Sequence, residues 1–364
     1  MDIKGTDNMS RPSYVFIDTK ALYHNLLVVK QHVKNKKVIA MVKCNAYGCG
    51  VDAVVNTLAP YVDGFGVACI EEAIKVQNIC NTANCILFQG IFSEKEFKIA
   101  YARNLQIAIH QERELAWLLN NPSANKISIW IKVNTGMHRL GFQLDEIPGV
   151  MTKLNACPWV KDIKIMTHLA CADNDLDNRN QSQVDKFNSL VGSYHKIDTS
   201  IANSAAILSN PDAQGDIVRA GIMLYGVSPF NEKTGKDLGL LPVMHFKSRL
   251  TTIYHYPANI DIGYGATWHS DEPCIIGIVP VGYGDGYPRN VINSYVWIRE
   301  QRVPVVGRVS MDMLTVDLTN CKNASLDDEV ELWGGNIPVE EVSHTADTIA
   351  YELLTRISSR VCRK

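Results

Sequence analysis

Up to about residue 240, short apolar runs alternate with longer stretches whose apolar residues recur every three or four positions. Short continuous apolar runs rich in β-branched residues are typical of buried parallel strands. The longer stretches predict helices that each cover a sheet with one apolar face. Repeated alternation of the two patterns predicts parallel βαβ units. We expect the strands at residues 14–18, 38–43, 64–69, 85–89, 105–110, 127–134, 163–169, 200–203 and 217–221.

The number of these units favours a closed barrel. Eight or nine units over roughly 220 residues fit a (β/α)8 TIM-type barrel, for which about 250 residues is typical. An open doubly wound sheet is the competing architecture. No Gly-x-Gly-x-x-Gly follows the first predicted strand, which disfavours a dinucleotide-binding version of that sheet. We therefore expect an α/β chain whose residues 1–240 form an N-terminal (β/α)8 barrel.

The pattern changes near Leu241. Residues 243–256 alternate between apolar and polar, and short strand-like runs separated by turn residues follow up to residue 333. Such alternation is typical of antiparallel strands with one buried face. A helical period returns at 339–358. We expect residues 241–364 to form a mainly antiparallel β domain that ends in one helix.

Composition and charge exclude several classes of protein. A chain of 364 residues exceeds what one ordinary hydrophobic core holds, so two domains are expected. Its formal net charge of -2 comes without a basic face, so neither nucleic acid nor an anionic membrane surface is an expected partner. The apolar runs are strand-sized, which predicts no transmembrane helix. The N-terminal residues lack an apolar signal core, and Met1 and Met9 are equally good starts. A cytoplasmic location is expected.

The ten cysteines are scattered through a large chain without a signal peptide, which favours reduced thiols. Cys44 and Cys49 resemble half of a metal site. Zinc needs three or four protein ligands, and no second pair with suitable spacing follows. We expect no metal.

A lysine stands where the second predicted strand gives way to a loop. The apolar run 37–42 precedes Lys43, and Gly48 and Gly50 follow it. Barrel active sites form at the carboxyl ends of the strands. There a lysine amine shielded from water is a nucleophile suited to Schiff-base chemistry. A strand-end lysine that merely reaches into water is the competing interpretation.

Further candidate residues stand near the ends of later strands. Arg139 follows the strand at 127–134, and a guanidinium binds carboxylates through two parallel hydrogen bonds. His168 ends the next long strand. Ser204 begins a predicted helix, where free N–H groups favour a phosphate. After the last strand, Gly221 lets the backbone approach a ligand closely.

Five sequence motifs, in order along both predicted domains, resemble motifs of the alanine racemase family. This family consists of fold-type III enzymes that use pyridoxal 5'-phosphate (PLP). The motifs surround Lys43 (42–50), Arg139 (131–142), Tyr264 (261–268), Tyr283 (281–289) and Met311 (307–312). The resemblance covers essentially the whole chain. It implies PLP-dependent interconversion of L-alanine and D-alanine, which supplies D-alanine for peptidoglycan synthesis.

The resemblance also implies a role for each site residue. Lys43 and Tyr264 are the two catalytic bases, one on each face of the substrate Cα. Because an ordinary phenol is hardly ionised at neutral pH, Tyr264 needs help from nearby groups, with His168 coupled to Arg219 as the relay. Arg219 faces the pyridine nitrogen of the cofactor. The residues implied in cofactor binding are Lys43, Tyr47, Arg139, His168, Asn203, Ser204, Arg219, Gly221, Ile222 and Tyr351.

Substrate contacts are implied for Arg139, Tyr264, Tyr283 and Met311, with Asp312 and Arg289 at the substrate entrance. Lys132 is carbamylated in many family members. Asn134 stands where the family commonly has aspartate, and Ser310 stands where relatives often have cysteine.

In the family, the β-domain residues come from the partner subunit, which implies a homodimer with an active site shared between subunits. Two other enzymatic interpretations are open. A broader racemase would also accept serine. A fold-type III decarboxylase would place an acid near the pyridine nitrogen, and Arg219 disfavours it. A non-catalytic PLP-binding barrel would lack the β domain altogether.

Overall fold

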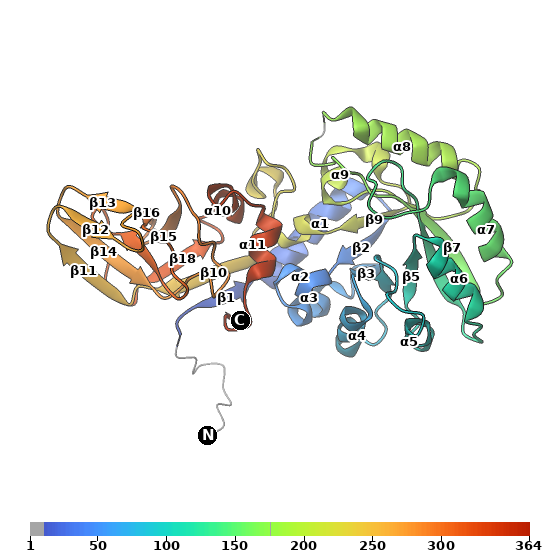
Figure 1. Ribbon diagram of the computed structural model, residues 1–364, viewed down its shortest axis with the longest axis horizontal. Coiled ribbons are helices and arrows are strands. Elements are labelled where there is room, and N and C mark those ends of the chain that lie inside the picture. Colours follow the sequence, from blue (N-terminus) through green and yellow to red (C-terminus); the bar gives the residue numbers. More distant parts are fainter. Residues whose placement is uncertain (1–10, 175) are drawn as a thin grey trace, which may run out of the picture. The chain divides into compact units, whose positions relative to one another are not determined.

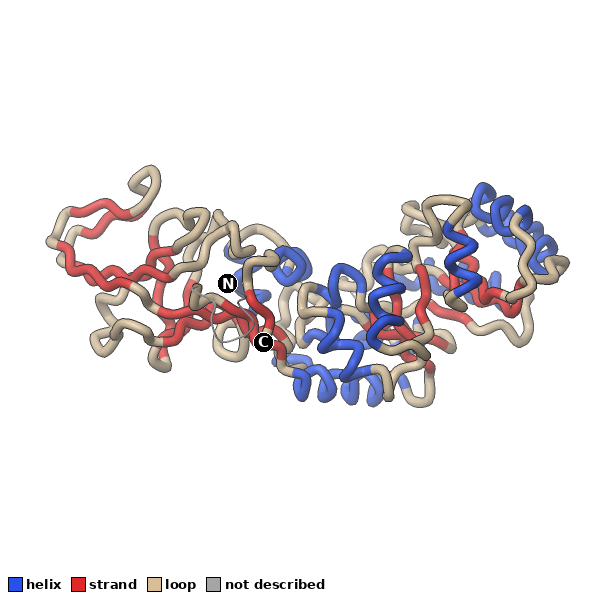
Figure 2. Tube along the Cα trace, turned by 90° about the horizontal axis from the view of Figure 1, so that it is seen from below, coloured by secondary structure: helices blue, strands red, loops and turns tan. Residues whose placement is uncertain are grey.

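The computed structural model describes residues 11–174 and 176–364, so the two possible starts at Met1 and Met9 lie outside the described residues (Figure 1). The chain divides into two compact units. The barrel unit comprises residues 22–224 and 228–233, and the β unit comprises the described residues up to Ala21 together with 225–227 and 234–364. Helices are concentrated in the barrel unit, whereas the β unit is mostly strand and loop (Figure 2).

Among the described residues, eight parallel strands form the centre of the barrel unit, in the order β8-β7-β6-β5-β4-β3-β2-β9. The backbone N–H of Arg219 donates to the carbonyl of Ala202 at 3.0 Å, which links the two ends of the sheet into a nearly closed barrel. The strands are β2 (Lys37–Met41), β3 (Gly64–Val67), β4 (Cys85–Leu87), β5 (Gln106–Ile109), β6 (Ile127–Lys132), β7 (Val160–Met166), β8 (Thr199–Ser200) and β9 (Ile217–Ala220).

Helices lie outside these strands (Figure 1). In the first helix, Leu22, Leu26, Val29 and Val33 are buried, which is the spacing of an amphipathic helix on a sheet. The helices are α1 (Thr19–Val33), α2 (Lys43–Tyr47), α3 (Val51–Leu58), α4 (Ile70–Ile79), α5 (Glu96–Ala102), α6 (Glu112–Asn120), α7 (Ile147–Asn155), α8 (Asn178–Val191) and α9 (Ser204–Ser209). Short 3-10 turns occur at Leu144–Glu146, Pro211–Ala213, Ile222–Tyr225 and Lys236–Leu238.

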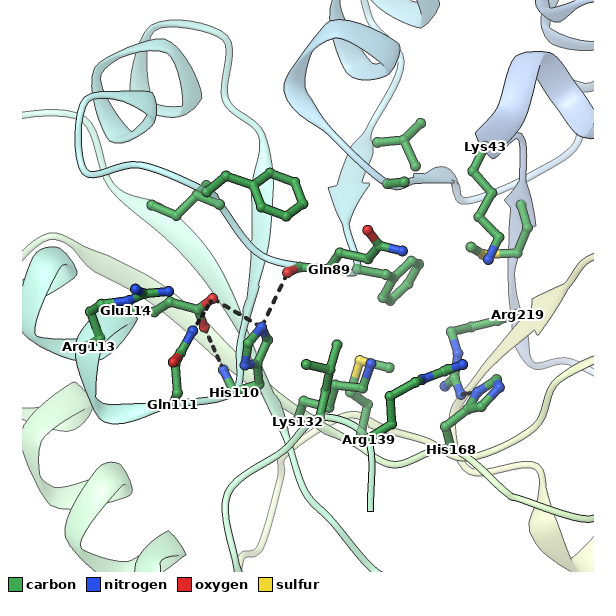
Figure 3. Close-up of a pocket in the computed structure, with 18 residues that line it drawn as sticks. Lys43, Gln89, His110, Gln111, Arg113, Glu114, Lys132, Arg139, His168 and Arg219 are labelled. Atoms are coloured by element: carbon green, nitrogen blue, oxygen red, sulfur yellow. Dashed lines mark hydrogen bonds and ion pairs between the residues drawn. The ribbon is translucent and has the colours of Figure 1, made fainter. Parts of the chain in front are cut away.

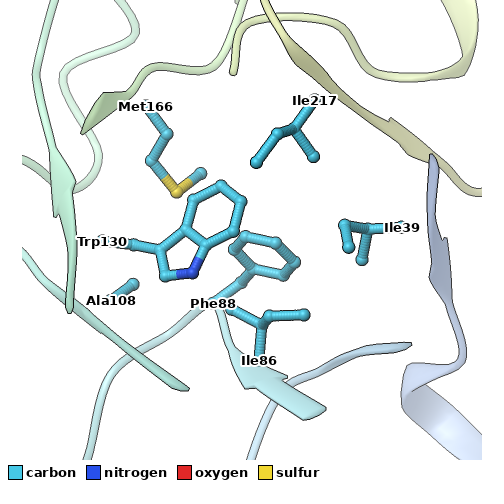
Figure 4. Close-up of a cluster of buried hydrophobic side chains, with 7 residues drawn as sticks. All are labelled: Ile39, Ile86, Phe88, Ala108, Trp130, Met166 and Ile217. Atoms are coloured by element: carbon cyan, nitrogen blue, oxygen red, sulfur yellow. The ribbon is translucent and has the colours of Figure 1, made fainter. Parts of the chain in front are cut away.

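Apolar side chains fill the interior of the barrel, as they do in packed TIM-type barrels. The cluster consists of Ile39, Ile86, Phe88, Ala108, Trp130, Met166 and Ile217 (Figure 4). The ring of Phe88 meets Trp130 edge-on at 5.3 Å, and the indole N–H of Trp130 donates to Gln106 Oε1 at 2.7 Å. Because Phe88 and Met166 also line the pocket described below, this cluster forms part of its floor.

The β unit contains a nine-stranded, mainly antiparallel sheet in the order β11-β14-β17-β16-β15-β18-β10-β1-β19, with a separate β12–β13 hairpin. Its strands are β1 (Tyr14–Ile17), β10 (Met244–Arg249), β11 (Thr252–Tyr256), β12 (Ile260–Ile262), β13 (Trp268–Ser270), β14 (Cys274–Val279), β15 (Tyr295–Ile298), β16 (Gln301–Val306), β17 (Leu314–Asp317), β18 (Glu329–Trp333) and β19 (Cys362–Arg363). The predicted fold class, a barrel followed by a mainly antiparallel β domain, is confirmed.

Two details differ from the prediction. The helix expected over 339–358 is two helices, α10 (Val339–Thr345) and α11 (Ala350–Arg356), and Asp347 between them has a φ of 51°. The strand expected at 14–18 forms, but assigning it to the barrel was wrong, because β1 pairs with β10 and β19 in the β unit.

The burial pattern of β1 gives the physical reason for that correction. Val15 and Ile17 are buried, whereas Tyr14 and Phe16 on the other face are not. Such alternation is typical of a sheet with one solvated face, whereas every residue of β9 is buried. The predicted domain boundary at residue 240 lies between β9 and β10, and it stays a prediction.

Candidate active site

A cavity of about 480 Å³ lies at the carboxyl ends of the barrel strands (Figure 3). Lys43, Arg139, His168 and Arg219 line it, so four of the predicted site residues come together in one pocket. The complete lining is Met41, Lys43, Val67, Ala68, Phe88, Gln89, Ile91, Phe92, His110, Gln111, Arg113, Glu114, Lys132, Arg139, Leu140, Met166, His168 and Arg219.

The backbone turn that carries Lys43 is strained. Residues 44–47 directly after it have φ values of 53–54°, in the left-handed region that residues with a side chain rarely adopt. Each such residue costs on the order of 1–3 kcal/mol, and such strain persists only where the surroundings enforce it. Glu72 contributes to that enforcement, since its Oε1 accepts the backbone N–H of Cys44 at 2.7 Å. The turn holds Lys43 at the carboxyl end of β2.

The pocket lining carries more positive than negative charge. Among its described lining residues are the cations Lys43, Arg113, Lys132, Arg139 and Arg219, and the single carboxylate Glu114. Burial, with further contributions from neighbouring cations, lowers the pKa of Lys132 to about 8. Burial also lowers the pKa of Arg219 to about 10. A pocket with this balance of charge suits an anionic ligand.

Arg219 is buried on β9, and oxygen acceptors surround its guanidinium. Nη2 donates to the carbonyl oxygens of Thr167 and Ile201, at 2.7 and 2.9 Å. Nη1 donates to the hydroxyl of Ser200. The same guanidinium lies 5.8 Å from the ring centroid of Phe88, over its face. These contacts fix its orientation without a carboxylate partner among the described residues.

His168 is the remaining neighbour of Arg219. Nη2 of Arg219 lies 3.2 Å from Nδ1 of His168. Because a guanidinium can only donate, Nδ1 must accept and the neutral imidazole carries its hydrogen on Nε2. Burial, and then the charge of Arg219, lower the pKa of His168 well below its usual value. The pair is therefore one guanidinium cation beside a neutral ring.

The loop after β6 positions Arg139. Residues 132–142 form a closed turn in which the N–H of Phe142 donates to the carbonyl of Lys132 at 2.9 Å. Inside it, Asn134 Oδ1 accepts the backbone N–H groups of Gly136 and His138, at 3.2 and 3.0 Å. An amide oxygen thus closes this turn, and no charged carboxylate is needed at that position.

Five other predicted residues form a compact cradle beside β9. The hydroxyl of Ser204 accepts the backbone N–H of Gly221 at 2.9 Å. A Cβ added at Gly221 would lie 2.8 Å from the hydroxyl of Tyr47, so this close approach of the tyrosine favours glycine. Asn203 caps α9 by accepting the N–H of Ala206 at 3.1 Å. Ile222, the next residue, is buried.

The other predicted site residues stand in the β unit. Tyr264 lies between β12 and β13 and is 70% exposed, with glycines of positive φ on both sides of it. Tyr283 and Met311 are also exposed, and their loops are joined, because the N–H of Tyr283 donates to the carbonyl of Ser310 at 3.0 Å. Tyr351 is on α11.

Sequence reasoning missed one group of pocket residues, His110, Glu114 and Gln89. Nε2 of His110 lies 3.3 Å from the carbonyl oxygen of Gln89 and 3.0 Å from Oε1 of Glu114, and the Glu114 carboxylate accepts the backbone N–H of His110 at 2.8 Å (Figure 3). Burial raises the pKa of Glu114 to about 7 and lowers that of His110. The available signal was that His110 ends a predicted strand, as His168 does.

Two features are absent from the described residues. No helix there is long and apolar enough to cross a membrane, and no group of three or more His, Cys, Asp or Glu side chains is arranged to hold a metal ion.

Comparison with known proteins identifies the family. Residues 17–229 match the family description "Alanine racemase, N-terminal domain", and residues 243–364 match "Alanine racemase, C-terminal domain". The alanine racemase of Legionella pneumophila (strain Lens) is 50% identical over 357 residues, which cover 97% of this chain and 99% of that protein. The alanine racemase of Stutzerimonas stutzeri is 41% identical over 355 residues, with the same coverage.

Solved structures of alanine racemases support the same family assignment. The biosynthetic alanine racemase of Pseudomonas aeruginosa superposes with a TM-score of 0.94 at 36% identity, and the alanine racemase of Acinetobacter baumannii with a TM-score of 0.93 at 40% identity. Each match covers 97% of this chain and 99% of the other. With both domains matched along almost their whole length, this chain belongs to the alanine racemase family.

Proposed function

We propose that this protein is a cytoplasmic, PLP-dependent alanine racemase that interconverts L-alanine and D-alanine and supplies D-alanine for peptidoglycan synthesis. The observation that carries the proposal is the buried guanidinium of Arg219, fixed by oxygen acceptors in the same pocket as Lys43. A decarboxylase on this architecture would need a carboxylate in that place.

The residues of the barrel unit fit PLP. The hydroxyls of Tyr47 and Ser204, which lie close together at Gly221, suit a phosphate, with Asn203 and Ile222 as further binding residues. The amine of Lys43 would anchor the cofactor, and Arg219 would face its ring nitrogen. When bound, PLP supplies an electron sink that weakens the Cα–H bond of an amino acid.

The position of Arg219 supports racemisation as the reaction. A guanidinium cannot accept a proton at neutral pH, so it leaves a facing ring nitrogen unprotonated. The neutral His168 behind it adds no proton, because its pKa is low. This arrangement limits how far negative charge spreads away from Cα, and it favours return of a proton to Cα.

Racemisation needs two bases, because one proton leaves one face of Cα and another arrives on the opposite face. We assign these roles to Nζ of Lys43 and the hydroxyl of Tyr264. The protein would act as a homodimer in which the β unit of one subunit completes the barrel pocket of the other. The exposure of Tyr264, Tyr283 and Met311 supports this, since all three are open to a second body.

Arg139 would bind the substrate carboxylate. Its neighbour Lys132 would be carbamylated, and the lowered pKa of Lys132 supports this because only a neutral amine adds to CO2. The resulting negative charge would offset part of the cationic excess in the pocket and hold Arg139 in place.

The test is D-alanine formation from L-alanine by purified protein supplied with PLP, with L-serine in parallel. We expect alanine turnover well above serine turnover. Comparable rates would indicate the broader racemase. Bound PLP without racemisation of either substrate, with CO2 release instead, would overturn the proposal in favour of a decarboxylase.

A further inference from the structure

A buried carboxylate in the β unit connects the loops that carry Tyr283 and Met311. Asp285 follows the Gly282-Tyr283-Gly284 turn, and its side chain is 0% exposed. Its Oδ2 accepts Nη2 of Arg11 at 2.8 Å and the backbone N–H of Gly282 at 2.9 Å. Its Oδ1 accepts Nε of Arg360 at 2.6 Å.

Arg360 extends this cluster to the second loop. Its Nη2 donates to Oδ1 of Asp312 at 2.7 Å and to the carbonyl of Met311 at 3.5 Å, while it also lies 3.1 Å from Oδ2 of Asp285. Arg11, near the other end of the chain, also contacts the second loop, because its Nη2 donates to the backbone carbonyl of Asp312 at 3.1 Å. Two guanidinium groups therefore clamp both loops onto one carboxylate.

The two loops touch backbone to backbone. A Cβ added at Gly282 would lie 2.2 Å from the carbonyl oxygen of Ser310, so this approach requires glycine. The N–H of Gly284 donates to the carbonyl of Met311 at 2.9 Å. A displacement of one loop would therefore move the other.

Asp285 also holds the segment after α11. Its backbone carbonyl accepts the N–H of Ser358 at 3.1 Å. Since α11 carries Tyr351, one residue joins three segments that bear predicted site residues. A fully buried charge is retained at such a place only when its hydrogen bonds are satisfied, and loss of one partner of a buried pair is strongly destabilising locally.

We infer that Asp285 is a positioning residue that fixes Tyr283 relative to Met311 and thereby sets how tightly substrate is bound. The inference deepens the proposed function and rests on it for its kinetic readout. Lys43 and Tyr264 stand on other segments, so the effect falls mainly on substrate binding.

The test compares Asp285→Asn with Glu331→Gln. Glu331 is a matched control, because it is also a buried carboxylate of the β unit, and it accepts backbone N–H groups from Asn336 and Ile337 on a different loop. We expect Asp285→Asn to raise KM for alanine about tenfold or more, with a smaller fall in kcat and an unchanged absorbance spectrum of bound PLP. Glu331→Gln should lower thermal stability and leave KM within twofold.

Arg360 provides a second variant in case Asp285→Asn does not fold. Its side chain is 38% exposed, so substitution there is tolerated more readily. Arg360→Ala should raise KM, and Arg360→Lys should restore it in part, because lysine keeps the charge but lacks the two-pronged donor geometry. Wild-type KM in both folded variants, or the same KM change in Glu331→Gln, would overturn the inference.

Hydrogen exchange separates this inference from the proposed function, since it needs no turnover. Asp285→Asn should accelerate amide exchange at residues 282–287 and 310–313, and Glu331→Gln should not. If the protein racemises nothing but this exchange difference is found, the positioning role stands and the function fails. Unchanged exchange in both loops would overturn the positioning role.

Discussion

Nη2 of Arg219 lies 3.2 Å from Nδ1 of His168, and the direction of that hydrogen bond fixes the protonation of the imidazole. The arginine donates, so the histidine must accept on Nδ1 and stay neutral. Burial reinforces this by lowering the pKa of His168. The pocket thus holds a guanidinium cation beside a neutral imidazole.

Arg219→Lys should lower kcat for alanine on the order of 100-fold, because a single ammonium cannot satisfy the acceptors at Ser200, Thr167 and Ile201 together with His168. Unsatisfied buried acceptors should also cost roughly 1–3 kcal/mol of unfolding free energy. Initial rates and urea unfolding measure the two effects. The matched control is Arg179→Lys, an exposed arginine of the same unit, and equal losses in both variants would contradict the assigned role.

Gly221→Ala should weaken PLP binding about tenfold or more, because the new Cβ would lie 2.8 Å from the hydroxyl of Tyr47 and push that hydroxyl out of the proposed phosphate cradle. Titration of the apoprotein with PLP, followed by absorbance, measures the dissociation constant. Gly149→Ala is the control, since nothing lies within 4 Å of its Cβ in α7. That variant should gain roughly 0.5–1 kcal/mol of stability. An unchanged affinity for PLP in Gly221→Ala would exclude the cradle.

Carbamylation of Lys132 should be detectable and should increase with pH. With a pKa of about 8, roughly a tenth of the Lys132 amine is neutral at pH 7, some 300 times the fraction of an ordinary lysine. Nζ would bond to the carbon of CO2 and release a proton, so 13C NMR in labelled bicarbonate should show a carbamate signal that grows from pH 7 to pH 9. Lys132→Met should lose the signal and Lys164→Met should retain it. A signal independent of Lys132 would refute the modification.

Glu114 should make the protein less stable as pH rises from about 4.5 to about 7. Its pKa is raised in the folded state, so over this range the unfolded chain has released the proton that the folded chain keeps. The effect is at most about 3 kcal/mol. Glu114→Gln removes it, so the melting temperature of this variant, relative to that of wild type, should rise from pH 5 to pH 8.

His110 acts in the opposite direction, because its lowered pKa contributes stability that is lost as pH falls. It is present in both proteins, so its contribution largely cancels in the comparison. Melting curves that run parallel across this pH range would show that Glu114 is not held protonated.

Local patterns determined the two-part architecture and several residues of the pocket. Parallel strands align their carboxyl ends, so Lys43, Arg139 and His168 were predicted to meet once the barrel was predicted, and all three line one pocket. Motif resemblance added Tyr264, Tyr283, Met311 and Tyr351 in the β unit, where their catalytic and binding roles stay predictions.

Only the tertiary structure decided which sheet each strand joins and which distant side chains meet. β1 has the same apolar run whether it pairs in the barrel or beside β10, because a periodic pattern specifies a buried face and leaves the partner open. The contacts of Asp285 with Arg11 and Arg360 join positions 274 and 75 residues apart. Likewise Glu114 acquires its raised pKa from burial at the pocket wall. Burial and long-range ion pairing depend on the packed chain, and local sequence carries no direct signal of either.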